Sequence, residues 1–205
     1  MSAGLLILVS APSGAGKTSL VAAALAADQR LVVSVSHTTR PRRPGEEDGI
    51  NYHFIEREAF ERMIESGAFL EHASVFDNHY GTSSAAVSAL RNEGKDVVLE
   101  IDWQGAQQVM EKYPDAVSIF ILPPDVATLR ERLTKRGQDS TEVIERRLAE
   151  AELEISQATR YDAIIVNEDF ARATEDLLAV IRAARVSTRQ QVTNNPTVRA
   201  ILSGQ

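Results

Sequence analysis

Short apolar runs alternate with amphipathic segments along most of the chain. The runs are rich in β-branched residues and show little polar alternation, as expected of parallel strands that are covered on both faces. They occupy residues 5–10, 31–36, 96–101, 116–122 and 163–166. Helical patterns lie between them, at residues 17–27, 84–92, 103–112, 125–135, 141–159 and 170–185. This alternation predicts an α/β fold with a doubly wound, five-stranded parallel sheet.

The stretch from residue 37 to about residue 91 breaks this rhythm. It contains a basic loop, a strand pattern at residues 52–54, a helical pattern at residues 56–66 and extended pieces at residues 69–76. We expect it to form a lobe inserted into the α/β core. The turn Arg136-Gly-Gln-Asp-Ser140, between two helical patterns, is expected to be a second mobile element.

A glycine-containing segment stands directly behind the first apolar run. It reads Ala11-Pro-Ser-Gly14-Ala-Gly16-Lys17-Thr18. A buried strand that breaks into such a turn and then opens a helix points backbone N–H groups and the positive helix end at one small volume, which suits a polyphosphate. Lys17 would add a charge near the β- and γ-phosphates, and the Thr18 hydroxyl would ligate Mg²⁺. The stricter motif has glycine in place of Ala11, but the flanking strand and helix favour a phosphate site over a chance turn.

Composition narrows the classes of protein that this site can belong to. The chain has 205 residues, 43% of them hydrophobic, which is enough for one core with insertions. A net charge of −7, from 22 Lys and Arg against 29 Asp and Glu, disfavours polymeric nucleic acid as a partner. The absence of cysteine excludes disulfides and thiolate metal sites. With neither a basic leader nor a bilayer-spanning apolar stretch, we expect a cytoplasmic protein without a membrane partner.

A basic loop opens the inserted stretch. It reads Ser36-His-Thr-Thr-Arg40-Pro-Arg42-Arg43-Pro-Gly45 and continues to Tyr52-His-Phe54. An isolated run of this kind is more often a solvated turn, and three acidic residues follow it closely. Its position after the second strand, however, faces it toward the edge of the sheet where the phosphate loop lies. Guanidinium groups suit the bidentate capture of a phosphate monoester, and a tyrosine hydroxyl adds a neutral donor.

The chain resembles guanylate kinases from residue 5 to about residue 185. The resemblance rests on six motifs in order, which are Ser36-His-Thr-Thr-Arg40, Arg43-Pro-Gly-Glu, Tyr52-His-Phe54, Phe69-Leu-Glu71, Tyr80-Gly-Thr82 and Glu100-Ile-Asp102-Trp-Gln-Gly105. It implies a P-loop NTPase fold and the reaction MgATP + GMP ⇌ MgADP + GDP. It also implies one domain, residues 1–205, made of a core (1–36, 92–124 and 160–185), a GMP-binding lobe (about 37–91), a helical lid (about 125–159) and a tail (186–205).

The same resemblance implies roles for particular residues. ATP would bind to Ala11, Pro12, Ser13, Gly14, Ala15, Gly16, Lys17 and Thr18. The GMP phosphate would be held by Arg40, Arg43, Tyr52 and Tyr80, and its base would be surrounded by Ser36, Glu71, Thr82 and Asp102. The catalytic residues would be Lys17, Arg40, Arg136 and Arg147, with Arg132 as a further lid candidate. Mg²⁺, which accompanies ATP, would be bound by Thr18, with Glu100 or Asp102 acting through water.

The guanine assignment also has a chemical basis. The Watson–Crick edge of guanine offers N1–H and an exocyclic amine, and a carboxylate such as that of Glu71 accepts hydrogen bonds from both. Adenine has an acceptor at N1, so a buried carboxylate there would be left unpaired, and such sites reject the wrong ligand by ~10⁴ or more. The alternative from the sequence alone is that Glu71 is a solvent-facing residue of an alternating strand.

Two other functions stay open at this point. A related P-loop kinase of another phosphorylated small molecule would keep the phosphate loop but lack Ser36, Glu71 and Thr82. A non-catalytic guanylate-kinase-like binding module would have a degraded phosphate loop, whereas Gly16, Lys17 and Thr18 are present here. Use of dGMP and assembly into a homo-oligomer are left open by the sequence.

Overall fold

The computed structural model describes residues 3–75, 77–135 and 141–204. The predicted mobile turn at residues 136–140, and with it the candidate Arg136, lies outside the described residues.

The core of the molecule is a parallel sheet with the strand order β2-β7-β1-β8-β9. Its five strands are β1 (Leu6–Ser10), β2 (Leu31–Val33), β7 (Asp96–Glu100), β8 (Val117–Leu122) and β9 (Ala163–Val166). All four neighbouring pairs are parallel, which confirms the sheet predicted from the apolar runs. The second strand is shorter than predicted, because the chain leaves this sheet after Ser34 donates to the Val98 carbonyl and pairs with another sheet from His37 onward.

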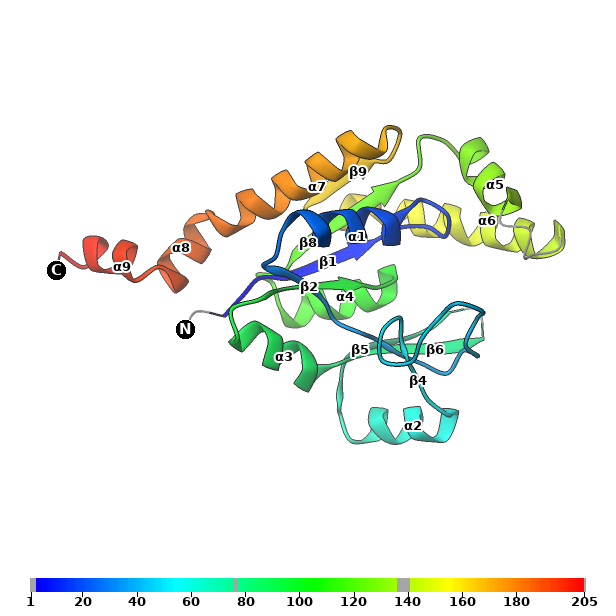
Figure 1. Ribbon diagram of the computed structural model, residues 1–205, viewed down its shortest axis with the longest axis horizontal. Helices are drawn as coiled ribbons and strands as arrows, with labels where there is room; N and C mark the ends of the chain where they lie inside the picture. Colours follow the sequence, from blue (N-terminus) through cyan, green and yellow to red (C-terminus); the bar gives the residue numbers. More distant parts are fainter. Residues whose placement is uncertain (1–2, 76, 136–140, 205) are drawn as a thin grey trace.

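Helices cover both faces of this sheet (Figure 1). On one face Ile7 and Val9 pack with residues of α1 (Lys17–Ala27) and α7 (Phe170–Arg185). On the other face Leu6 and Leu8 pack with residues of α3 (Ser84–Asn92) and α4 (Trp103–Lys112). Alternate side chains of a strand point to opposite faces, so a run that is apolar at every position builds both cores at once.

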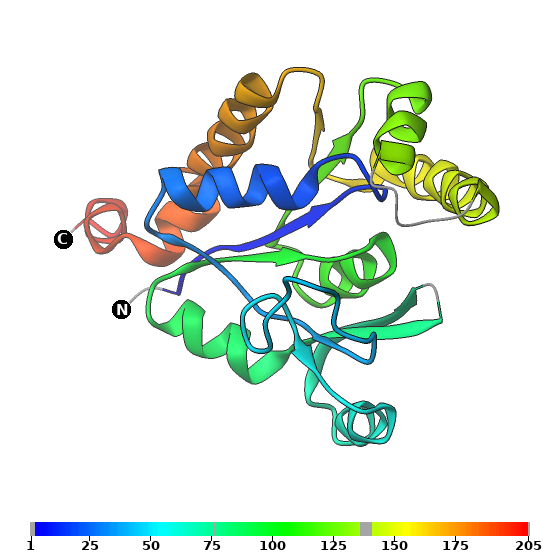
Figure 2. The ribbon, with the colours of Figure 1, turned by 45° about the vertical axis from the view of Figure 1, so that its right-hand side comes forward.

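The stretch after residue 36 forms a second sheet, with the order β4-β3-β6-β5 (Figure 2). Its elements are β3 (His37–Thr38), β4 (His53–Phe54), α2 (Arg57–Glu65), β5 (Phe69–Val75) and β6 (Asn78–Ser83). The predicted strand at 52–54, the helix at 56–66 and the extended segment at 69–76 correspond to β4, α2 and β5. β3 and β6 were not predicted, and β6 pairs with both β3 and β5. Helix α2 is anchored to this sheet by Phe60, whose ring lies 4.5 Å from that of Phe69.

A pair of helices connects β8 to β9. It lies near the carboxyl ends of the central strands, on the side away from the second sheet (Figure 1). It consists of α5 (Val126–Lys135) and α6 (Thr141–Ser156), and a 3-10 turn, η1 (Ala158–Arg160), completes the segment predicted as one helix to residue 159. The pair has its own apolar cluster, made of Leu129, Leu133, Ile144, Leu148 and Ala151. The two insertions therefore flank the carboxyl ends of the central strands, where ligands bind in open α/β sheets.

The tail forms two short helices, α8 (Thr188–Asn194) and α9 (Pro196–Leu202), which extend away from the sheet beside the N-terminus (Figure 1). Only the bounds of this tail, 186–205, were predicted from the sequence, and the structure shows that it is mainly helical. No helix in the described part of the chain combines the length and the apolar character that a bilayer crossing needs.

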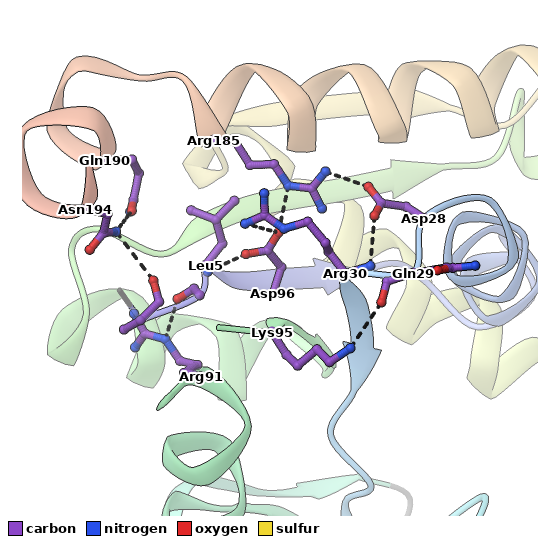
Figure 3. A network of polar contacts seen from close by, with 12 residues as sticks. Leu5, Asp28, Gln29, Arg30, Arg91, Lys95, Asp96, Arg185, Gln190 and Asn194 are labelled. Atoms are coloured by element: carbon purple, nitrogen blue, oxygen red, sulfur yellow. Dashed lines mark hydrogen bonds and ion pairs between the residues drawn. The ribbon is translucent and has the colours of Figure 1, made fainter. Parts of the chain in front are cut away.

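A buried ion-pair network ties the end of α7 to the amino ends of the strands (Figure 3). Asp96, at 0% exposed, accepts hydrogen bonds from the Leu5 backbone N–H at 2.8 Å and from Arg185 Nε at 2.7 Å. Arg185 also donates to Asp28 at 2.6 Å, and this hydrogen bond holds the pKa of Asp28 below its ordinary value. The network joins α1, β1, β7 and α7 at the end of the sheet opposite the insertions.

Replacing Asp96 by alanine is expected to destabilise the fold by about 3 kcal/mol, because it leaves the Leu5 N–H unsatisfied and removes one partner of a buried ion pair. For a chain of this size that corresponds to a melting temperature lower by roughly 6 to 12 °C. The exposed pair of Arg57 and Glu61 provides the control, since Glu61→Ala should cost no more than about 0.5 kcal/mol. Equal melting temperatures for the two variants would show that the network contributes little.

Candidate functional site

A cavity of about 310 Å³ lies at the carboxyl ends of β1 and β7, between the two insertions. Four parts of the chain line it: the loop after β1, the lobe, the end of β7 and helix α6. The lining residues are Ala11, Pro12, Ser13, Gly14, Gly16, Lys17, Thr18, Ser19, Ser36, Arg43, Tyr52, Glu71, Val75, Tyr80, Glu100, Ile101, Asp102, Arg147 and Glu154. Most residues predicted to bind nucleotide are therefore brought together around one volume.

The loop after β1 has the backbone that its glycines permit. Gly14 and Gly16 have φ of 95° and 96°, in the left-handed region that favours glycine. Gly16 is the N-cap of α1, and a Cβ added to it would lie 2.4 Å from Nδ2 of Asn167. That same Nδ2 donates a 2.7 Å hydrogen bond to the Ala15 carbonyl. The side chain of Asn167, which directly follows β9, thus holds the turn through the Ala15 carbonyl. The N-terminus of α1 lines the cavity.

Lys17 and Thr18 are held against the end of β7. Lys17 Nζ donates to the Ile101 carbonyl at 3.2 Å, and Thr18 Oγ1 donates to Glu100 Oε2 at 2.9 Å. Both side chains line the cavity, so a cation and a hydroxyl–carboxylate pair stand beside the helix N-terminus.

The predicted arginines take different positions. Arg43 and Arg147 line the cavity. Arg40 does not; its guanidinium donates to Glu46 at 2.7 Å and lies 5.5 Å from the centre of the Tyr52 ring. Arg132 donates at 3.4 Å to the Ala15 carbonyl and at 3.4 Å to the Asn167 carbonyl, so in this structure it braces the phosphate loop from outside the cavity lining.

Glu71 is buried, at 3% exposed, so the alternative of a solvent-facing residue is wrong. Its Oε1 accepts a hydrogen bond from Thr82 Oγ1 at 2.5 Å, and Ser36 Oγ lies 3.3 Å from that hydroxyl. Burial raises the pKa of Glu71 to about 7, against the opposing effect of the Thr82 hydrogen bond. β5, β6 and the segment after β2 thus place a carboxyl and two hydroxyls side by side.

Asp102 caps helix α4, with Oδ1 accepting from the Gly105 N–H at 2.9 Å. It also lines the cavity, and burial raises its pKa. Tyr52 and Tyr80 also line the cavity, with their ring centres 5.9 Å apart. Burial raises the pKa of Tyr52 above its ordinary value of 10.0, so its hydroxyl is a neutral donor near pH 7.

Two residues of the site were not identified from the sequence: one lines the cavity, and the other holds the phosphate loop. Glu154 of α6 lines the cavity, and burial raises its pKa to about 7, while the Ser13 N–H and Lys17 favour its charge. Nothing in the sequence separates Glu154 from the other glutamates of α6. Asn167 could have been found from its position as a polar residue directly after an apolar strand pattern.

The arrangement can bind an anion chain at the loop and a phosphate monoester beside Arg43 and the tyrosines. The oxygen atoms of Thr18, Glu100 and Asp102 are the kind of ligand that Mg²⁺ prefers. Among the described residues no cluster of three or more His, Cys, Asp or Glu is suited to hold a metal alone. This donor set fits Mg²⁺ bound mainly by water and phosphate oxygens, as is usual for nucleotide-dependent enzymes.

Comparison with known proteins identifies the family. A sequence model of the family "Guanylate kinase" matches residues 3–184. A guanylate kinase from Alkalilimnicola ehrlichii is 58% identical over 188 residues, covering 92% of this chain and 93% of that protein. One from Hahella chejuensis is 55% identical over 206 residues, covering 100% and 99%. A crystal structure of guanylate kinase from Anaplasma phagocytophilum superposes with a TM-score of 0.78 at 34% identity, covering 100% of this chain and 96% of that one. The chain therefore belongs to the guanylate kinase family.

Proposed function

We propose that this guanylate kinase transfers the γ-phosphoryl group of ATP to GMP, giving ADP and GDP, and that the transfer takes place in the cavity at the carboxyl ends of β1 and β7. One observation carries the proposal. The phosphate loop and the buried pair of Glu71 and Thr82 line or adjoin the same cavity, so a polyphosphate and a base with two donors can occupy it together.

We assign the guanine to the lobe side of the cavity. Ionised Glu71 accepts from N1–H and the exocyclic amine, while the Thr82 hydroxyl donates to the carboxylate and is itself held by Ser36. Asp102 lies close enough to Glu71 to raise the pKa of that carboxyl, so it adjoins the same base. The phosphate of GMP then lies between Arg43, Tyr52 and Tyr80, which are all on the lobe. Arg40 belongs to this set if its guanidinium is shared between Glu46 and the phosphate.

We assign ATP to the loop formed by residues 11–18. Backbone N–H groups and the N-terminus of α1 receive the phosphates, and Lys17 contributes a full positive charge. Thr18, with Glu100 or Asp102 through water, would hold the Mg²⁺ that family members use with ATP; when bound, the ion neutralises charge on the phosphate oxygens.

The chemistry requires little from a general base. The phosphate of GMP, with a second pKa near ~6, is largely a dianion at neutral pH and can attack the γ-phosphorus directly. The new bond forms between its oxygen and that phosphorus, and the bond to the β-phosphate oxygen breaks. Lys17, Arg43 and Arg147 are placed to spread the developing charge around the cavity. Arg136 stays a further candidate from the sequence. We further propose that the lobe and the helix pair α5–α6 close over the substrates, because water is the competing nucleophile.

Release of ADP from ATP and a panel of phosphorylated acceptors tests the proposed function. GMP should be the preferred acceptor over AMP, CMP, UMP and a ribose bisphosphate, with dGMP measured alongside. Preference for the ribose bisphosphate would support the related-kinase alternative. Tight binding of GMP without ADP release would support a non-catalytic module.

The pH dependence of GMP binding should report Glu71. The pKa of this carboxyl is raised to about 7, and only the charged form accepts both guanine donors, so a proton must leave before GMP binds. Affinity should level off about one pH unit above 7, and below 7 the protonation of Glu71 should lower it by up to about tenfold per pH unit, in addition to the effect of the GMP phosphate, which titrates near ~6. In Glu71→Gln this dependence should disappear, leaving only the titration of GMP's own phosphate. Calorimetric binding constants between pH 5.5 and 8 would check this, and parallel profiles for the two proteins would contradict it.

A further inference from the structure

A glycine stands inside the first turn of α4, two residues after its start. Within residues 3–75, 77–135 and 141–204, Gly105 is the only glycine that lies inside a helix. Glycine is a poor helix former, since it has more conformational freedom to lose than alanine. Glycine is therefore expected at this position for one of two reasons. Either the backbone has a conformation that other residues avoid, or the surroundings leave no space for a side chain.

The backbone supplies no such reason. Gly105 is not among the positive-φ glycines of the described residues, so an alanine could adopt its conformation without strain. The space does supply one. A Cβ on Gly105 would lie 2.4 Å from Glu71 Oε2, 3.0 Å from Glu71 Cδ and 3.3 Å from Asp102 Oδ1. The Glu71 carboxylate thus occupies the space that a side chain at residue 105 would fill, and it lies directly against α4.

Glu71 has little freedom to accommodate a methyl group there. Its other oxygen, Oε1, accepts the 2.5 Å hydrogen bond from Thr82, and the residue is enclosed by protein on almost all sides. Moving Oε2 away from residue 105 either breaks the Thr82 bond or pushes the carboxylate toward the cavity. Both movements change where the two acceptor oxygens stand relative to a bound base.

We infer that Gly105 is a specificity-determining positioning residue: by lacking a side chain it sets the depth at which the Glu71 carboxylate meets the base. This inference rests on the proposed function, in which Glu71 accepts from the Watson–Crick edge of guanine. Gly105 itself touches no substrate. It acts through Glu71, and its effect should therefore appear in the choice between bases and not in the use of ATP.

The variant Gly105→Ala tests this. kcat/KM for GMP should fall by about 30-fold or more, because both guanine donors meet a displaced acceptor, whereas IMP, which lacks the amine, should lose about tenfold less. KM for ATP should be unchanged. Glu111→Ala, on an exposed turn of the same helix, is the control. Its GMP/IMP ratio of kcat/KM and its KM for ATP should equal those of the unaltered protein. An unchanged GMP/IMP ratio in Gly105→Ala would overturn the inference.

A double-variant cycle separates the predicted collision from a general disturbance of α4. Aspartate is one methylene shorter than glutamate, so in a Glu71→Asp background the added Cβ loses its collision with the carboxylate of residue 71 and keeps only the 3.3 Å approach to Asp102 Oδ1. Gly105→Ala should then cost less than about threefold in kcat/KM for GMP, far below its cost in the unaltered protein. If Gly105→Ala lowers the melting temperature, Glu71→Asp should restore it. Equal costs in both backgrounds, or a melting temperature that Glu71→Asp fails to restore, would contradict the inference.

The GMP/IMP ratio of kcat/KM, measured for Glu71→Gln beside Gly105→Ala, distinguishes this inference from the proposed function. If Glu71→Gln leaves the GMP/IMP ratio unchanged, the assignment of guanine to Glu71 fails. If Glu71→Gln changes the ratio and Gly105→Ala does not, only the role of Gly105 fails.

Discussion

Lys17→Met is expected to lower kcat by ~10² or more while the melting temperature stays unchanged. Lys17 lines the cavity, and its Nζ donates a hydrogen bond to the Ile101 carbonyl at 3.2 Å. Methionine keeps most of the length and apolar volume of lysine, so the change removes mainly the charge. That charge lies beside the loop where we propose that the γ-phosphoryl group is transferred, so its loss should affect the transition state more than the binding of GMP.

Lys95→Met is the matched control for this variant. Lys95 stands at the opposite end of the sheet, where its Nζ donates to the Gln29 carbonyl at 3.4 Å (Figure 3). Its replacement should leave kcat within about twofold. ADP release at saturating ATP and GMP, together with thermal unfolding, measures both quantities. Near-normal turnover of Lys17→Met with a native melting temperature would rule out the proposed transfer mechanism.

The central sheet could be predicted because its inner strands β1, β7 and β8 are covered on both faces. A strand such as β1 is then apolar at every position up to its last residue, Ser10, and the glycines and helix that follow it leave few alternatives. The edge strand β9 does not meet the expectation of coverage on both faces, since it exposes Ile164 and Val166. The inserted lobe gave a weaker signal. β3 is two residues long, and β6 reads Asn78-His-Tyr-Gly-Thr-Ser83, with no apolar alternation. Their pairing depends on contacts between residues about 40 positions apart, and no local pattern records such contacts.

The site shows the same division. Residues on the phosphate loop could be placed from the sequence because strand, turn and helix fix their positions together. Arg132 was one of the lid candidates to reach ATP or its transferring phosphoryl group, but its direction depends on how α5 packs, and here it donates to the Ala15 and Asn167 carbonyls. The burial of Glu71 could be expected only from the family resemblance and from no local pattern, since it results from α4 packing against β5. Side-chain direction on a packed helix and burial at a contact between elements are tertiary properties, and they account for most of what the sequence left open.

Glu71→Gln is expected to be the most selective change in the protein. It keeps the size of the side chain, removes its charge and turns one of two acceptors into a donor. GMP should lose roughly 2 to 4 kcal/mol in kcat/KM, the scale of a charged hydrogen bond plus an unpaired buried group. IMP has N1–H but no exocyclic amine, so it should be a poor substrate of the unaltered protein and be penalised less by the change.

Arg43→Ala is the control for base reading. Arg43 lines the cavity on the lobe and is assigned to the phosphate of the acceptor. A phosphate contact does not depend on the base, so this variant should weaken GMP and IMP by similar factors.

The ratio of kcat/KM for GMP to kcat/KM for IMP, measured for the unaltered protein and these two variants, tests the account most directly. We predict a large ratio for the unaltered protein, a ratio at least about tenfold smaller for Glu71→Gln, and no change for Arg43→Ala. A ratio that Glu71→Gln leaves unchanged, or that Arg43→Ala changes as much, would show that guanine is not bound at Glu71.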